Sequence, residues 1–315
     1  MIVDLIPDED QSAIEDTIVS FLSDMLPVER LRDAASHGGA AESAVWSQLC
    51  ELGLFGLGLP EEQGGLGLGL PEEVLVARAL GRNLVSPGVL AQLCAPHLTS
   101  DESVRDALIA GEARAAFAID QAYVLDGEGA DWIVVFGPGG ASLRARGELT
   151  LAATHGGLDH TMHFERIEGG AGNTQPALRL EVLIAAYLTG IAQAATDMAV
   201  EYAKTREQFG QPIGAFQAIK HSCADMATRA SAADTQTLYA ATVFGAGEDD
   251  AVEAAAARTL AKRAAFENAK ANIQTHGGMG FTAECDAHLF LKRAMVMDML
   301  GSDSPARRAA LTATA

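Results

Sequence analysis

Apolar side chains recur every three to four residues along much of the chain, and this spacing predicts helices. In the N-terminal part, one such series covers residues 14–25 and a second covers residues 45–53. The glycine-rich stretch 53–67 predicts a loop that packs against the core. The helical spacing resumes at Pro71, because a proline followed by two glutamates suits a first helical turn.

The pattern changes at residues 113–172. Short apolar runs at 115–120, 132–136 and 149–151 are separated by glycine-containing turns, which predicts a small sheet. Residues 169–173 are again rich in glycine and predict a linker.

From residue 176 onward the helical spacing returns in longer stretches. Apolar faces cover residues 183–202 and 216–226, and residues 252–273 are rich in alanine, which favours close helix packing. The predicted fold is therefore mainly α, with a helical N-terminal domain (1–112), a small middle β domain (113–172) and a C-terminal four-helix bundle (173–315).

Charge is unevenly distributed over the 315 residues. The net charge is −20, of which residues 1–172 carry −18 with nine arginines, no lysine and 27 acidic residues. This excess of acidic residues argues against nucleic acid and anionic membranes as partners. We expect an anionic ligand to bind the less acidic second half of the chain. Acidic residues near the N-terminus, four widely spaced cysteines and no uninterrupted apolar run of about 20 residues predict a cytoplasmic protein. The histidines show no metal-ligand spacing, so no metal is expected.

The first motif whose residues could bind a ligand joins two predicted helices. It contains Arg206, Phe209 and Gly210, followed by Phe216 and Gln217. Arginine can bind a phosphate in a bidentate manner, and phenylalanine can stack on a purine. The alternative is a surface arginine beside core aromatic residues.

The second motif follows the alanine-rich segment. Gln274 precedes the pair Gly277 and Gly278, and Gly280 comes two residues later. Glycines let the backbone approach a ligand and present N–H groups to phosphate oxygens. The alternative is a simple helix end followed by a turn.

Together the two motifs resemble the paired signatures of the acyl-CoA dehydrogenase family. The segment from Trp46 to Gly67, with Leu59-Pro60-Glu61-Glu62, is similar to the helical N-terminal domain of that family, and the α–β–α order agrees. Acyl-CoA oxidases share parts of the pattern. The resemblance implies FAD as cofactor, contacted on its ADP side, at the interface with a neighbouring subunit, by Arg206, Phe209, Phe216, Gln217, Gln274, Gly277 and Gly278.

The chain departs from the family in two places. Residues 113–172 are about half as long as the family's middle domain and lack its Thr-Glu-Pro-Gly-x-Gly-Ser-Asp-like loop and its Trp-Ile-Thr/Ser-like segment, which hold the flavin ring and acyl-CoA. The family's late catalytic glutamate is also missing, because no Glu occurs in the stretch after Arg293. Glu181 is a candidate for the early position of the base, but it is one residue out of register.

With the retained motifs and the missing loops, the chain resembles the short subunits of heterotetrameric (α2β2) acyl-CoA dehydrogenases. The resemblance implies a full-length partner subunit, a steroid-derived acyl-CoA as substrate and an electron acceptor such as an electron-transfer flavoprotein. Two alternatives remain open at this point. One is a self-sufficient homotetrameric acyl-CoA dehydrogenase, and the other is a non-catalytic helical scaffold of the same fold.

Overall fold

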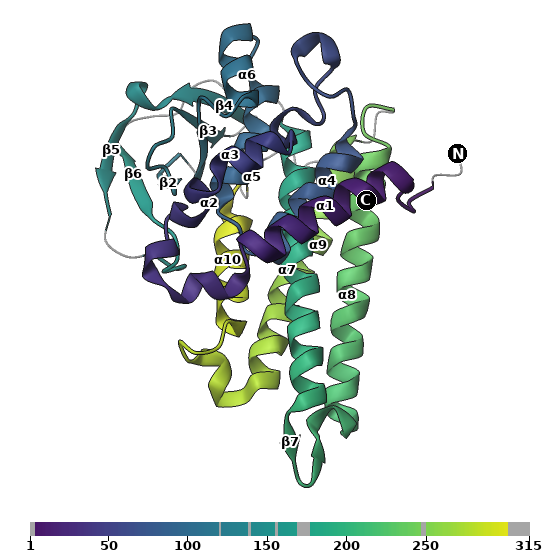
Figure 1. Cartoon of the computed structure of the whole chain (residues 1–315). Helices are drawn as coiled ribbons and strands as arrows, with labels where there is room; N and C mark the ends of the chain where they lie inside the picture. The colour runs from purple at the N-terminus through teal and green to yellow at the C-terminus, as the bar shows by residue number, and fades with distance from the viewer. Residues whose placement is uncertain are drawn as a thin grey trace.

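The computed structural model of the chain describes residues 4–119, 121–137, 140–154, 157–168, 177–246 and 250–301. Within these ranges the chain forms a helical N-terminal part, a six-stranded sheet and a bundle of long helices (Figure 1). The predicted fold class is therefore confirmed. The predicted linker at 169–173 lies outside the described residues.

The N-terminal part contains six α-helices. The first is capped by Asp8, whose carboxylate accepts a hydrogen bond from the Gln11 backbone N–H at 2.8 Å. The predicted loop at 53–67 contains two 3-10 turns, Leu54–Gly56 and Glu61–Gln63. Its residues Leu54, Leu57 and Leu59 are buried, whereas Leu66 is exposed. The helices are α1 (Glu9–Met25), α2 (Ala40–Ala44), α3 (Trp46–Glu51), α4 (Leu70–Arg82), α5 (Pro87–Cys94) and α6 (Glu102–Ile109).

The middle part is a single sheet with strand order β4-β3-β1-β2-β6-β5, in which only the β1–β3 pair is parallel. Its inner face, which includes Phe117 and Phe136, packs into the main core, whereas its outer face forms a small separate cluster. The strands are β1 (Ala115–Ile119), β2 (Tyr123–Leu125), β3 (Trp132–Gly137), β4 (Gly140–Ala145), β5 (Thr150–Ala153) and β6 (Phe164–Glu168).

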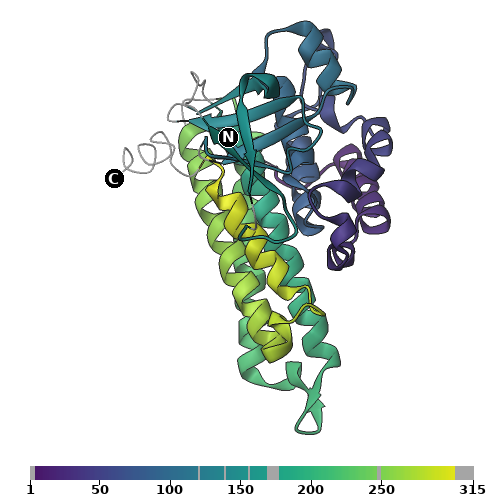
Figure 2. The ribbon, with the colours of Figure 1, turned by 90° about the vertical axis from the view of Figure 1, so that its left-hand side faces the viewer.

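The C-terminal part consists of α7 (Leu178–Thr205), α8 (Gln217–Thr242), α9 (Asp250–His276) and α10 (Ala287–Met299). Figure 2 shows this bundle extending away from the sheet and ending in the short hairpin β7 (Glu207–Gln208) and β8 (Gln211–Pro212). Helix α7 crosses α4 closely, because a Cβ on Gly190 would lie 2.0 Å from the Arg78 carbonyl oxygen. By length and composition α7 could cross a membrane, but 78% of its apolar window is buried inside the protein.

A buried polar network joins the three parts. Asp126, in the turn after β2, accepts hydrogen bonds from Ser86 Oγ at 2.7 Å and from the His163 backbone N–H at 2.8 Å. Arg293 on α10 donates to Asp159 Oδ2 at 2.8 Å and to the Leu84 carbonyl oxygen at 2.7 Å. No periodic pattern predicts this network, because its members come from turns and from isolated positions in helices.

The network makes stability depend on pH through Asp126. Burial raises the pKa of this carboxyl group from 3.8 to about 6, against the opposing hydrogen bond from Ser86. The folded protein therefore holds this proton more tightly than the unfolded chain, and this contribution to stability is lost as pH rises from about 4 to about 6.

We expect Asp126→Asn to raise the free energy of unfolding at pH 8 by on the order of 1–3 kcal/mol, because asparagine carries no charge to bury. The gain should shrink toward zero at pH 4, where Asp126 is protonated. Urea denaturation at both pH values measures this difference in the free energy of unfolding. The control is Asp16→Asn, because Asp16 is exposed. A difference that does not change with pH would show that the charge of Asp126 has no such cost.

Candidate cofactor site

The structure brings the two sequence motifs to the same end of the bundle. Helix α7 ends at Thr205, so that Arg206 is its C-cap, and α9 ends at His276, where the turn Gly277–Phe281 begins. The Tyr202 ring stacks on the His276 ring, with 4.1 Å between centroids and 24° between planes. Sequence reasoning missed this contact, although Tyr202 precedes Arg206 by one helical turn and His276 lies inside the second motif.

The first motif is held by its backbone and leaves its side chains exposed. The Arg206 N–H donates to the Tyr202 carbonyl at 2.8 Å, and the Ile213 N–H donates to the Arg206 carbonyl at 2.8 Å. Phe209 is 93% exposed at a φ of 54°, a backbone conformation that phenylalanine rarely adopts. Its ring meets Phe216 edge to face, with 6.1 Å between centroids. The side chains of Arg206 and Gln217 are exposed too.

This arrangement is costly for an isolated chain, since an exposed aromatic ring gains nothing from burial and a non-glycine residue at positive φ is strained. Such features accumulate at binding sites. The first motif therefore has the properties of a surface that a ligand or another subunit covers.

The second motif also leaves its backbone open. Gln274, Gly277 and Gly278 are exposed, and Gly277 has a φ of 61°. A Cβ on Gly277 or Gly278 would meet no described atom within 4 Å, whereas a Cβ on Gly280 would lie 2.6 Å from the Ile273 carbonyl oxygen. Packing within the chain therefore explains the glycine at 280 but not the glycine at 278.

Glu181 lies at the opposite end of α7. It is buried in the first turn, where it accepts a hydrogen bond from Arg258 Nε at 3.2 Å. Arg258 in turn donates through Nη2 to the carbonyl oxygens of Met297, Asp298 and Leu300, at the end of α10. Glu181 is thus one partner of a buried ion pair that holds the end of the last described helix.

The late position of the base falls at the end of α10. The helix ends at Met299, and Gly301 follows with a φ of 65°. A Cβ on Gly301 would lie 2.3 Å from Glu181 Oε1, so the end of the described stretch after Arg293 lies beside Glu181. Arg293, which marks this stretch in the sequence, is buried in the network described above.

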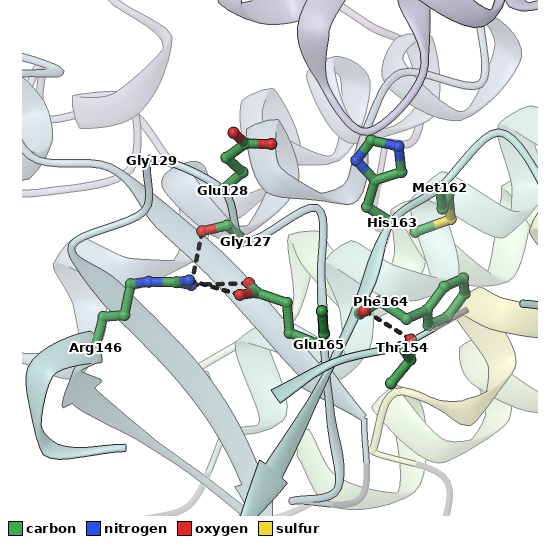
Figure 3. A pocket seen from close by; sticks show the side chains of 10 residues that line it. Gly127, Glu128, Gly129, Arg146, Thr154, Met162, His163, Phe164 and Glu165 are labelled. Carbon is green, nitrogen blue, oxygen red and sulfur yellow. Dashed lines mark hydrogen bonds and ion pairs between the residues drawn. The ribbon is translucent and has the colours of Figure 1, made fainter. Parts of the chain in front are cut away.

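The sheet region carries a cavity of about 430 Å³ (Figure 3). Arg146 lines it but forms a bidentate ion pair with Glu165, at 2.7 and 2.9 Å, and also donates to the Gly127 carbonyl at 2.8 Å. None of the predicted cofactor-binding residues lines this cavity. Its arginine is already neutralised, so the cavity is a poor site for a phosphate.

Among the described residues, no group of three or more His, Cys, Asp or Glu side chains is placed to hold a metal ion. The described cysteines are all free thiols.

Comparison with known protein families agrees with this architecture. The model of the acyl-CoA dehydrogenase N-terminal domain matches residues 8–102, and that of the acyl-CoA dehydrogenase C-terminal domain matches residues 170–308. The chain belongs to the acyl-CoA dehydrogenase family. Residues 103–169, which contain the sheet, lie between the two matched ranges.

Among individual proteins, the chain is similar to acyl-CoA dehydrogenase IpdE2 of Mycobacterium tuberculosis (strain ATCC 25618 / H37Rv). The two are 32% identical over 306 residues, which cover 91% of this chain and 92% of IpdE2.

Two solved assemblies contain chains of the same fold. One is the ChsE4-ChsE5 complex from Mycobacterium tuberculosis, with a TM-score of 0.80, 20% identity, and coverage of 99% of this chain and 98% of that chain. The other is the Tcur3481-Tcur3483 steroid ACAD G363A variant, with a TM-score of 0.79, 22% identity, and coverage of 97% and 96%.

Proposed function

We propose that this chain is a subunit of a flavin-dependent acyl-CoA dehydrogenase and that it supplies the ADP side of an FAD site completed by a longer partner subunit. The observation that carries the proposal is the distance between its motifs and its sheet. Glu181, which like Phe136 of the sheet lies beside Gly301, is about 37 Å from Arg206 along α7, at 1.5 Å per residue. That distance exceeds the length of an extended FAD molecule, so the motifs serve a flavin ring held by another subunit.

The exposed groups at the tip fit the ADP half of FAD. Arg206 would bind the pyrophosphate, and Phe209 and Phe216 offer aromatic faces and edges to the adenine. The open backbone at Gly277 and Gly278 would approach the phosphates, with Gln274 and Gln217 as polar neighbours. The Tyr202–His276 stack would hold the two motifs at a fixed separation.

The reaction would be α,β-dehydrogenation of an acyl-CoA thioester. A carboxylate would remove the α proton, and bound FAD would supply the hydride acceptor for the β carbon. In this chain Glu181 is engaged with Arg258, and the described end of α10 carries no glutamate. We therefore assign the base and the flavin-ring pocket to the partner subunit.

The likeness to a steroid ACAD and to a complex of two different chains supports a steroid-derived acyl-CoA as substrate and an α2β2 assembly. An electron-transfer flavoprotein would reoxidise the flavin, and we place the complex in the cytoplasm. A self-sufficient homotetramer would need a catalytic base of its own. A non-catalytic scaffold would not explain why the side chains of Arg206 and Phe209 are exposed.

The assembly is tested by native mass spectrometry of the tagged chain purified from its own host. We expect two copies of this chain with two copies of a longer acyl-CoA dehydrogenase chain and bound FAD. A homotetramer that retains FAD would contradict it.

Glu181→Gln should leave turnover of the assembled enzyme within a few-fold of the parent, because glutamine can still accept the hydrogen bond from Arg258. Glu181 is one residue out of register with the early position of the base, and one residue turns a helical side chain by about 100°. Catalysis tolerates little misplacement of a base, so Glu181 is in the wrong direction for this role. Steady-state turnover with FAD content measured in parallel checks this. A loss of three or more orders of magnitude with FAD still bound would make Glu181 the base.

A further inference from the structure

Three histidines, one from each part of the chain, lie in a row on the side of α10. His37 precedes α2, His160 lies in the turn before β6, and His288 is on α10. The ring centroids are 5.7 Å apart for His37 and His160, and 5.9 Å apart for His160 and His288. Lys292, one helical turn after His288, donates from Nζ to His160 Nδ1 at 3.1 Å. We call these four residues the histidine cluster.

The carboxylates nearest to the histidine cluster are engaged elsewhere. Asp159 pairs with Arg293 at 2.8 Å, and Asp286 pairs with Arg32 at 2.7 Å. The histidine cluster is thus a group of basic side chains, without a carboxylate of its own, in a chain of net charge −20. The arrangement is not explained by helix or sheet packing alone.

The groups of the histidine cluster also repel one another. Partial burial and then the charge of Lys292 lower the pKa of both His160 and His288, and the neighbouring histidine lowers each further. Asp159 opposes this shift in the pKa of His160, and a backbone hydrogen bond at Thr282 together with Asp286 opposes it in the pKa of His288. The Nδ1 atom of His288 is buried and has no hydrogen-bond partner among the described residues. His37 donates from Nε2 to the Leu31 carbonyl at 2.9 Å, which fixes its ring.

We propose that the histidine cluster binds a doubly charged oxyanion of the phosphate-monoester type. A dianion would accept hydrogen bonds from Lys292 and from protonated imidazoles, and it would relieve the repulsion among them. Because His160 is exposed, the site is open to solvent. Bound there, the anion would link the N-terminal part, the sheet and the bundle.

The site is tested on the purified full chain by NMR of ¹³C-labelled histidine rings. Inorganic phosphate is titrated at pH 6.5 against sodium chloride of equal ionic strength. We expect the signals of His160 and His288 to shift and saturate with phosphate only, and their apparent pKa values to rise by about one unit. Affinity should fall about tenfold between pH 6 and pH 8.

Variants identify the residues involved. Lys292→Met and His160→Gln should weaken phosphate binding at least tenfold, and Lys292→Arg, which keeps the charge, should preserve it. His221→Gln on α8 is the control and should bind phosphate like the parent. Equal shifts with chloride, or unchanged binding in both His160→Gln and Lys292→Met, would overturn the proposal.

The anion could be free phosphate or the phosphate monoester of a nucleotide. Coenzyme A and dephospho-coenzyme A, which differ by one phosphate monoester, separate these sources. Saturation with coenzyme A but not with its dephospho form would assign the site to the nucleotide. Equal and weak effects of both, with saturation by inorganic phosphate, would assign it to the free ion.

Discussion

Arg206→Ala should weaken FAD binding by the assembled complex about tenfold to a hundredfold. A bidentate, charge-assisted hydrogen bond to a phosphate is worth about 1.5–3 kcal/mol, and alanine removes it entirely. The side chain of Arg206 is exposed, and only its backbone takes part in the described hydrogen bonds. The thermal stability of the chain should therefore change by no more than about 1 kcal/mol.

The matched control for this substitution is Lys204→Ala. Lys204 is an exposed cation two residues earlier, paired with Glu201 on the same helix at 2.6 Å. Fluorescence titration of released and rebound FAD gives the affinity, and calorimetry gives the stability. If both variants weaken FAD binding equally, the loss comes from the lower positive charge of this region and not from a specific contact of Arg206. If Arg206→Ala unfolds the chain and leaves affinity unchanged, Arg206 is structural.

Gly278→Val should lower FAD occupancy at least tenfold and leave the isolated chain folded. Its Cβ would point into space that no described atom of the chain fills, so the penalty arises only when a ligand or a partner must approach. Gly280→Ala should instead destabilise the isolated chain. Its Cβ would lie 2.6 Å from the Ile273 carbonyl oxygen, and the chain must shift to accept it.

The melting temperature of the isolated chain and the FAD content of the assembled complex are measured for both glycine variants. We expect Gly280→Ala to lower the melting temperature by several degrees and Gly278→Val to leave it nearly unchanged. Loss of stability in Gly278→Val, with normal FAD content, would show that this glycine serves the fold.

Helical spacing predicted α7 and α8, and an alanine-rich run predicted α9. The first half of α7 is buried on all sides and α9 packs through alanines, so neither has a single apolar face. The sheet was predicted only in part. Strands β1, β3 and β5 are apolar and visible in the sequence, but β2 is only three residues long. Strand β4 carries an arginine, and β6 carries an arginine and two glutamates, since much of the surface of both strands is not buried. Their pairing comes from neighbouring strands and not from their own composition.

Motif recognition placed Arg206 and Gly277 in one site, and the structure brings their segments together. Their roles toward FAD stay predictions. The sequence could not show that Glu181 meets Arg258, or that His37, His160 and His288 share one surface. Such contacts join residues far apart in the chain and leave no local pattern. They depend on the packing of whole domains.

The most direct test of a cofactor site shared with a partner is the flavin content and acyl-CoA turnover of the purified chain, measured alone and after assembly with the longer subunit. We expect no flavin absorbance and no turnover for the chain alone, and both after assembly. A full complement of FAD with acyl-CoA turnover by the chain alone would contradict it.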